Sequence, residues 1–170
     1  MMFEQIPLTV LGISHKTAPV DIREQVALSV DEQHDILNAL AADEHSHGAI
    51  VLSTCNRTEI YLSSDHTESS LSTFHSWFET NKSVSHFREE FAYIYTGYDA
   101  LFHFFKVISS LDSQIVGETQ ITGQVKDAYN RALELKATDS LLNKIFNFGI
   151  QAQKKVRNDT YLCQGAVSIS

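Results

Sequence analysis

The sequence predicts an α+β fold: a four-stranded, mainly antiparallel sheet with helices on one face, followed by C-terminal helices. Two observations carry this prediction. Up to Gly97, short apolar and β-branched runs alternate with amphipathic segments in the order β-α-β-β-α-β. After Gly97, the apolar residues recur only at the three- to four-residue spacing of helices. With 170 residues, 43% of them hydrophobic, the chain suits one domain, or one domain with an appendage.

Four segments have the composition of strands. Residues 8–14 are rich in β-branched and apolar side chains. They end before Pro19, which cannot donate a backbone hydrogen bond to a sheet. Two apolar runs, residues 49–52 and 60–62, flank a polar junction and are expected as the second and third strands. Residues 91–95 are expected as the fourth.

Helical segments separate these strands. Residues 20–28 suit a short helix, and a longer one is expected from Ser29 to about residue 42. Ser29 is the candidate N-cap, and Glu32 follows at the spacing of a capping box. Residues 65–82 carry large apolar side chains on one helical face: Leu71, Phe74, Trp77 and Phe78. The resulting order is that of the ferredoxin-like, split βαβ fold.

Three helices are expected after the sheet. The first covers residues 98–116 and is broken by Gly117, the second runs to about residue 136, and Asp139 or Ser140 caps the third. In the first helix the apolar spacing continues through Ile115, which places His103 on the opposite, polar side.

Asp112 interrupts this apolar face. A buried carboxylate must be paired or hydrogen-bonded. We therefore expect Asp112 to cap a nearby group or to support a site.

The composition argues against several classes of protein. The chain has no apolar run long enough to cross a membrane, and its N-terminus has no basic region typical of a secretory signal. Its two cysteines, Cys55 and Cys163, fit reduced thiols of a cytoplasmic protein better than a disulfide. A formal charge of −8 argues against a general nucleic-acid coat protein. The densest basic run, residues 154–157, suits the last turn of a helix.

No metal site is predicted. His45 and His47 lie among acidic residues in a polar loop, but no further potential ligands cluster with them.

The polar junction between the second and third strands, residues 53–59, is chemically the richest stretch. Thr54, Cys55, Asn56 and Arg57 present a hydroxyl, a thiol, an amide and a guanidinium. A thiolate beside a fixed cation is a better nucleophile, and arginine can hold a carboxylate bidentately. The alternative is a small structural cysteine beside a surface arginine. The junction alone does not decide between them.

Three separated motifs together resemble the glutamyl-tRNA reductase family. They are Gly12-Ile13-Ser14-His15-Lys16-Thr17-Ala18-Pro19-Val20 with Arg23-Glu24, Leu52-Ser53-Thr54-Cys55-Asn56-Arg57-Thr58-Glu59, and Leu111-Asp112-Ser113 with Gly117-Glu118-Thr119-Gln120-Ile121 and Gln124-Val125-Lys126. The match covers nearly the whole chain in order. The family catalyses the first committed step of tetrapyrrole (5-aminolevulinate, haem) biosynthesis.

The resemblance implies roles for individual residues. Cys55 would attack the ester carbonyl of glutamyl-tRNA to form a thioester, and hydride from NADPH would then release glutamate-1-semialdehyde. Passing the acyl group to sulfur divides a difficult reduction into two steps. His103 would be important for activity, and the expected substrate-binding residues are Thr54, Asn56, Arg57, Ser113, Glu118, Thr119, Gln120 and Gln124. Arg57 would hold a substrate carboxylate, and Glu118 could hold the α-ammonium.

The resemblance also implies a domain organisation. Residues 1–137 would form the catalytic, glutamyl-tRNA-binding domain, residues 138–160 the start of a linker helix, and residues 161–170 the entry to an NADPH-binding domain that is absent here. The sequence has no G-x-G-x-x-G motif, in agreement with that absence. The family's enzymes are homodimers, but without the dimerisation domain we expect a monomer. Glutamate-1-semialdehyde aminotransferase and regulatory proteins are further candidate partners.

Two positions depart from the family's pattern. Thr119 stands where proline is usual, and Ser110 where glycine is frequent. Cys163 matches no catalytic motif and is expected to be structural. Two other hypotheses remain open: a binding module for tRNA or a regulatory protein with an unreactive Cys55, and a Cys–His hydrolase. The hydrolase requires His103 within hydrogen-bond reach of Cys55.

Overall fold

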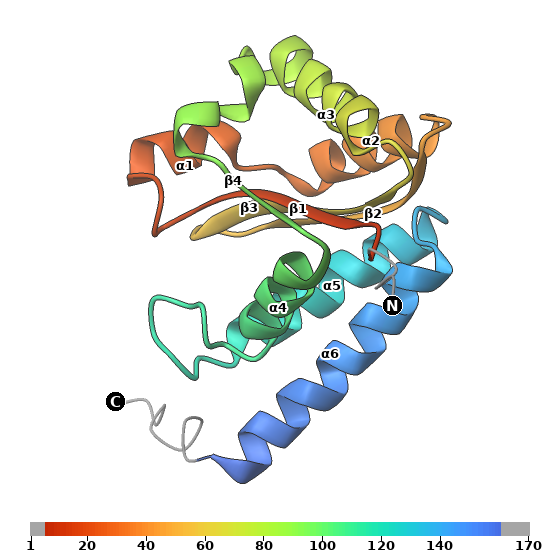
Figure 1. Ribbon diagram of the computed structural model, residues 1–170. Helices are drawn as coiled ribbons and strands as arrows, with labels where there is room; N and C mark the ends of the chain where they lie inside the picture. Colours follow the sequence, from red (N-terminus) through yellow and green to blue (C-terminus); the bar gives the residue numbers. More distant parts are fainter. Residues whose placement is uncertain (1–5, 161–170) are drawn as a thin grey trace.

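The structure, a computed structural model, describes residues 6–160 and has a four-stranded sheet at its centre (Figure 1). The strands are β1 (Leu8–Ser14), β2 (Ser46–Ser53), β3 (Arg57–Ser64) and β4 (Tyr93–Thr96). Their order is β2-β3-β1-β4, and all three pairings are antiparallel. This confirms the predicted ferredoxin-like sheet.

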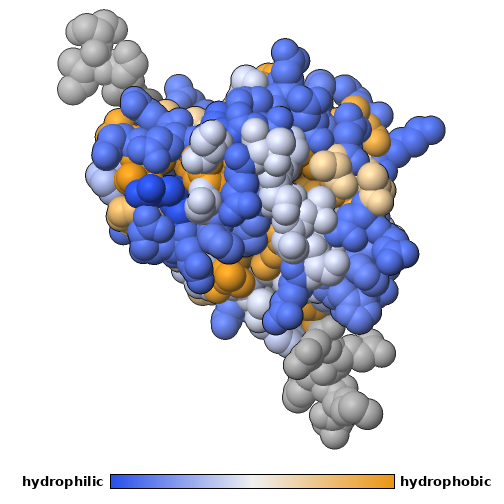
Figure 2. Space-filling model, turned by 90° about the horizontal axis from the view of Figure 1, so that it is seen from above, coloured by the Kyte–Doolittle hydropathy of each residue, from blue (hydrophilic) through white to orange (hydrophobic). Residues whose placement is uncertain are grey.

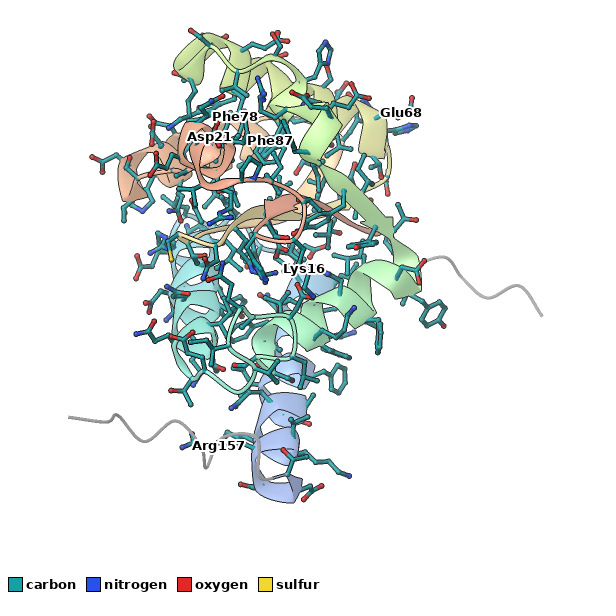
Figure 3. The ribbon with its side chains drawn as sticks, turned by 90° about the vertical axis from the view of Figure 1, so that its left-hand side faces the viewer. Lys16, Asp21, Glu68, Phe78, Phe87 and Arg157 are labelled. Atoms are coloured by element: carbon teal, nitrogen blue, oxygen red, sulfur yellow. The ribbon has the colours of Figure 1, made fainter. Side chains whose placement is uncertain are left out.

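The first three helices cover one face of the sheet (Figure 1). They are α1 (Val20–Val26), α2 (Val30–Ala41) and α3 (Thr67–Lys82), followed by the short 3₁₀ turns Ser85–Phe87 and Glu89–Phe91. The predicted capping box of α2 is present: the Ser29 side chain accepts from Glu32 N, and Glu32 Oε2 accepts from Ser29 N. Phe78 and Phe87 pack between α3 and the sheet, with ring centroids 4.7 Å apart (Figure 3). The outer surface of this layer is largely hydrophilic (Figure 2).

The C-terminal helices cover the opposite face (Figure 1). They are α4 (Gly97–Ile108), α5 (Gln120–Glu134) and α6 (Ser140–Asp159). Asp139 caps α6 by accepting from Leu142 N at 2.8 Å. The far end of α6, which carries Arg157, extends away from the sheet (Figures 1 and 3). No helix within residues 6–160 combines the length and the apolar character needed to cross a lipid bilayer.

The structure corrects the predicted first C-terminal helix. It ends at Ile108, because Ser110 adopts a left-handed conformation with φ of 60°. The following residues form an irregular loop in which Ile115 is 66% exposed. The buried face of α4 is rotated from the predicted one and consists of Ala100, His103, Phe104, Val107 and Ile108. His103 is therefore buried, and its expected place on a polar stripe is wrong.

The register of the sheet brings three residues together on the face that meets α4. Gly12 of β1 lies between Glu59 of β3 and Tyr93 of β4. A Cβ atom at Gly12 would lie 2.7 Å from Glu59 Cγ and 2.8 Å from the Tyr93 hydroxyl. Glycine at this position therefore gives the two polar side chains room to meet.

A candidate active site at the ends of β2 and β3

A cavity of about 130 Å³ opens beside the turn that joins β2 to β3. Three separate segments form it: the turn, the loop between α4 and α5, and the first turns of α5. Its lining residues are Thr54, Cys55, Asn56, Arg57, Ser113, Glu118, Gln120, Ile121 and Gln124. The structure thus gathers Cys55 and seven of the eight predicted substrate-binding residues around one space. Ile121 is the one lining residue that the sequence did not suggest.

The turn places Cys55 at its exposed tip as a free thiol. Thr54 shapes the turn, because its Oγ1 accepts from the backbone N–H groups of Asn56 and Arg57, each at 3.2 Å. Neighbouring segments hold the turn from outside: His15 N donates to Asn56 O at 2.8 Å, and Arg23 Nε donates to Cys55 O at 3.3 Å. The thiol is therefore fixed in position while its side chain stays accessible.

Arg57 lines the cavity, but its guanidinium is buried among carboxylates. Nη1 donates to Glu59 Oε1 at 2.9 Å, and both Nη atoms lie 3.2 Å from Asp112 Oδ2. Nη2 also donates to the backbone oxygen of Asp112 at 2.5 Å. Burial would lower the pKa of Arg57, but Glu59, Tyr61, Tyr93 and Asp112 around the guanidinium together outweigh burial and raise this pKa. Arg57 is therefore a permanent cation whose orientation Glu59 and Asp112 fix.

Asp112 is buried and paired, as its place in the sequence predicted. Besides Arg57, it binds Lys16, whose ammonium donates to Oδ1. Lys16 lies below the sheet, on the side of the C-terminal helices (Figure 3). Burial would raise the pKa of Asp112, but the Lys16 hydrogen bond and the charge of Arg57 lower it. Asp112 thus links the loop that carries Ser113 to β3 and to the turn that follows β1.

Glu59 is the centre of the buried polar network and was not singled out as a site residue from the sequence. It is 0% exposed. Its Oε1 accepts from Arg57 and, at 2.5 Å, from the Tyr93 hydroxyl, and its Oε2 accepts from the Tyr61 hydroxyl. Burial alone would raise the pKa of Glu59, but the His103 hydrogen bond and the charge of Arg57 lower it to about 2. The spacing of Glu59, two residues after Arg57 on one strand face, was the available signal.

His103 faces this network and not the thiol. Its Nε2 lies 2.7 Å from Glu59 Oε1, and an ionised carboxylate can only accept, so His103 donates. Its ring also packs against Tyr95, with centroids 4.9 Å apart. In residues 6–160, His103 forms no hydrogen bond with Cys55 and does not line the cavity. The direct Cys–His contact that the hydrolase hypothesis requires is therefore not present.

The two positions that depart from the family pattern shape the loop before α5. Ser110 Oγ donates to the backbone oxygen of Glu118, and Gly117 N donates to Ser110 O at 3.1 Å. The Ser110 backbone is left-handed, a conformation that glycine adopts without strain, which explains why glycine is frequent at this position in the family's pattern. Thr119 is the N-cap residue of α5 and, alone among the predicted substrate-binding residues, does not line the cavity.

The two histidines considered as metal ligands lie in different elements: His45 precedes β2, and His47 lies within it. His47 Nε2 lies 2.7 Å from Asp65 Oδ1 at the surface. Within the described part of the chain, no three His, Cys, Asp or Glu side chains converge as ligands for a metal ion.

Comparisons with known proteins agree on one family. The family described as "Glutamyl-tRNAGlu reductase, N-terminal domain" matches residues 11–160. Glutamyl-tRNA reductase of Carboxydothermus hydrogenoformans is 42% identical over 165 residues, which are 96% of this chain and 36% of that protein. The enzyme of Pelotomaculum thermopropionicum is 39% identical, covering 96% of this chain and 37% of its own.

A solved structure supports the same assignment. Glutamyl-tRNA reductase from Methanopyrus kandleri superposes with a TM-score of 0.77 at 32% identity, over 96% of this chain and 37% of the other. The chain thus spans well under half the length of these relatives. It belongs to the glutamyl-tRNA reductase family and corresponds to that family's N-terminal domain.

Proposed function

We propose that this chain accepts the glutamyl group of glutamyl-tRNA on Cys55 as a thioester. This is the first half of the NADPH-dependent reduction of glutamyl-tRNA to glutamate-1-semialdehyde, which opens tetrapyrrole biosynthesis. One observation carries the proposal: Cys55 shares a small cavity with seven of the eight predicted substrate-binding residues, which come from three separate segments. In this arrangement residues 1–137 are the catalytic unit, and α6 begins the linker helix.

The acyl transfer follows from the chemistry of the groups at the cavity. The Cys55 thiolate attacks the ester carbonyl, the bond from that carbon to the ribose oxygen breaks, and this oxygen takes up a proton to become the free hydroxyl of the departing tRNA. NADPH would then supply the hydride that reduces the thioester. The sequence contains no dinucleotide-binding motif, so we assign no residue of this chain to the cofactor.

Charge and hydrogen bonding in the cavity suit a glutamyl group. Arg57 would attract the side-chain carboxylate, although Glu59 and Asp112 already occupy its Nη atoms. Uncharged donors beside it, among them Gln120 and Gln124, would complete the binding of that carboxylate, and Glu118 would bind the α-ammonium. Buried polar groups left unpaired by a smaller substrate would provide the selectivity.

His103 is better placed as a positioning residue than as a proton carrier at the thiol. It donates to Glu59, which in turn fixes Arg57. We infer that His103 contributes to acylation indirectly, by holding Glu59 and, through Glu59, Arg57 in position. A His103→Gln variant, which keeps a donor, should then lose less acylation than His103→Leu. The opposite ranking, or equal losses, would exclude this positioning role.

Intact-protein mass spectrometry after mixing with glutamyl-tRNA tests the proposal. A glutamyl adduct should form on the parent chain and on Cys163→Ser, which keeps Cys55, but not on Cys55→Ser. An absent adduct with an intact glutamyl ester would refute thioester formation and favour the binding module for tRNA or a regulatory protein. An absent adduct with ester hydrolysis that depends on Cys55 would show that water reaches the thioester first.

A further inference from the structure

Gly123 lies in the exposed middle of α5, and no contact within the described residues requires glycine there. A Cβ atom at this position would have no neighbour within 4 Å. At Gly12, Gly48 and Gly149, by contrast, a Cβ atom would come within 2.6 to 2.8 Å of another atom. Glycine weakens an exposed helix interior relative to alanine. Within the described residues, no packing contact therefore compensates for the helix stability lost at Gly123. A binding partner whose surface approaches α5 closely would explain the glycine.

The position of Gly123 relative to the cavity suggests what that surface is. Gly123 follows Gln120 by three residues and precedes Gln124 by one, and both glutamines line the cavity. The exposed turn of α5 around Gly123 therefore borders the candidate active site. The cavity, at about 130 Å³, has room for an aminoacyl group but not for a nucleotide. The remainder of a tRNA-borne substrate must therefore lie across the surface beside the cavity.

The distribution of charge favours this side of the molecule for RNA. Residues 6–96, which form the sheet and the layer of α1–α3, contain five Lys and Arg against thirteen Asp and Glu. Residues 120–160, which form α5 and α6, contain seven Lys and Arg against four Asp and Glu. The excess of acidic residues in the sheet and the α1–α3 layer, whose outer surface is the hydrophilic face in Figure 2, would repel an RNA backbone, and the α5–α6 side would attract it.

We propose that the exposed face of α5 around Gly123 is the surface on which the RNA part of the acyl donor lies when its glutamyl group enters the cavity. Gly123 permits the closest approach, and Lys126, one turn further along the exposed side of α5, contacts a phosphate. Asp127 also lies on this face and opposes RNA binding. This inference rests on the proposed acyl transfer to Cys55.

A Gly123→Ala substitution separates the RNA contact from helix stability. The variant should have a higher melting temperature than the parent, because alanine favours helix. Its acylation by a small activated glutamyl α-ester should be unchanged, but its acylation by glutamyl-tRNA should fall roughly tenfold, since small misplacements of reacting groups slow reactions strongly. Gly123→Gln should lower the tRNA rate further. Asn38→Ala on the exposed face of α2 is the matched control, with no loss in either assay.

Substitutions of charged residues test the proposed RNA surface independently of Gly123. Lys126→Gln should weaken glutamyl-tRNA binding and reduce the slope of log affinity against log salt by about one. Asp127→Asn should strengthen binding. Lys144→Gln removes an equal charge from an exposed position on α6, outside the face around Gly123, and should have a smaller effect than Lys126→Gln.

The outcomes distinguish this inference from the proposed function. If the parent chain is acylated neither by the small ester nor by glutamyl-tRNA, the proposed function fails. If the parent is acylated by both, and Gly123→Ala and Gly123→Gln match it on glutamyl-tRNA, the RNA surface is refuted. A protein partner would then be the candidate occupant of this face. An equal loss on both donors would refute it as well, because the substitution would then have damaged the cavity itself.

Discussion

Glu59 sets the geometry of the residues that surround Arg57. Four groups from β3, β4 and α4 donate to its carboxylate, so it joins three elements at one point. A buried ion pair of this kind contributes little net stability compared with apolar packing. Removing only one of its partners, however, lowers the unfolding free energy strongly, because the other charge stays buried without a partner. Its value at this site lies in holding Arg57 in one orientation at the cavity.

Replacing Glu59 with glutamine should therefore destabilise the chain and disturb the cavity. Arg57 would lose the charge of one of its two buried carboxylates, and removing one partner of a buried ion pair costs about 3 kcal/mol or more of unfolding free energy. Denaturant unfolding measures this cost, and mass spectrometry measures the expected slower acylation of Cys55. Glu68→Gln, a surface change at the start of α3, is the control and should leave both unchanged. A Glu59→Gln variant as stable as the parent would show that the network carries little energy.

The depressed pKa of Glu59 also predicts acid sensitivity. In the unfolded chain this carboxyl takes up a proton near its ordinary pKa of 4.5, but in the folded chain only near 2. Between these values the unfolded state binds more protons, so the stability that Glu59 contributes is present above pH 4.5 and is lost as the pH falls towards 2. Urea unfolding across this range should show a smaller loss for Glu59→Gln than for the parent. Parallel curves would contradict the assigned pKa.

At the scale of elements, the segment that follows α5 contains a residue in an unfavourable conformation. Lys136 has φ of 55°, and Ala137 N donates back to Ala132 O at 2.8 Å across the last turn. This left-handed position after a helix favours glycine, which lacks the Cβ atom responsible for the strain. Lys136→Gly should therefore raise the unfolding free energy by about 1 kcal/mol. Lys144→Gly, inside α6, should lower it by about the same amount, and thermal unfolding of both variants tests the contrast.

The elements that could be predicted are those with local signals. The capping box of α2, the Asp139 cap of α6 and the β-branched run of β1 all depend on neighbours in sequence. The end of α4 could not be predicted, because Ser110 gives no sign of its left-handed backbone. Apolar residues at helical spacing continue past this point, although the structure exposes Ile115 in a loop.

The same distinction applies to the candidate site. The residues that line the cavity were predicted because they lie in motifs that resemble the family's. The role of Glu59 depends instead on strand register, which sets it opposite Gly12 and near Tyr93. Register and the rotation of α4 are tertiary properties, so His103 was expected on the wrong side of its helix and the link to Glu59 was missed.

At the scale of the whole molecule, one layer is acidic and the other supplies most of the cavity wall. The turn between the edge strand β2 and the central strand β3 contributes Cys55, and Arg57 begins β3. The helix α5 and its preceding loop close the cavity from the other face. This division places the thiol at the boundary between the layers. We expect the chain alone to be monomeric, and sedimentation equilibrium tests that expectation.

The same organisation predicts which half of the reaction this chain performs by itself. With glutamyl-tRNA and NADPH present, the glutamyl adduct on Cys55 should form, but no glutamate-1-semialdehyde should appear, because the sequence contains no dinucleotide-binding motif and covers 36% of a full-length relative. The adduct should persist or decay by hydrolysis at a rate that NADPH does not change. Carboxydothermus hydrogenoformans glutamyl-tRNA reductase serves as the positive control for detecting semialdehyde. Semialdehyde formed by this chain, and lost in Cys55→Ser, would mean that residues of this domain bind the nucleotide in a way that the sequence does not reveal.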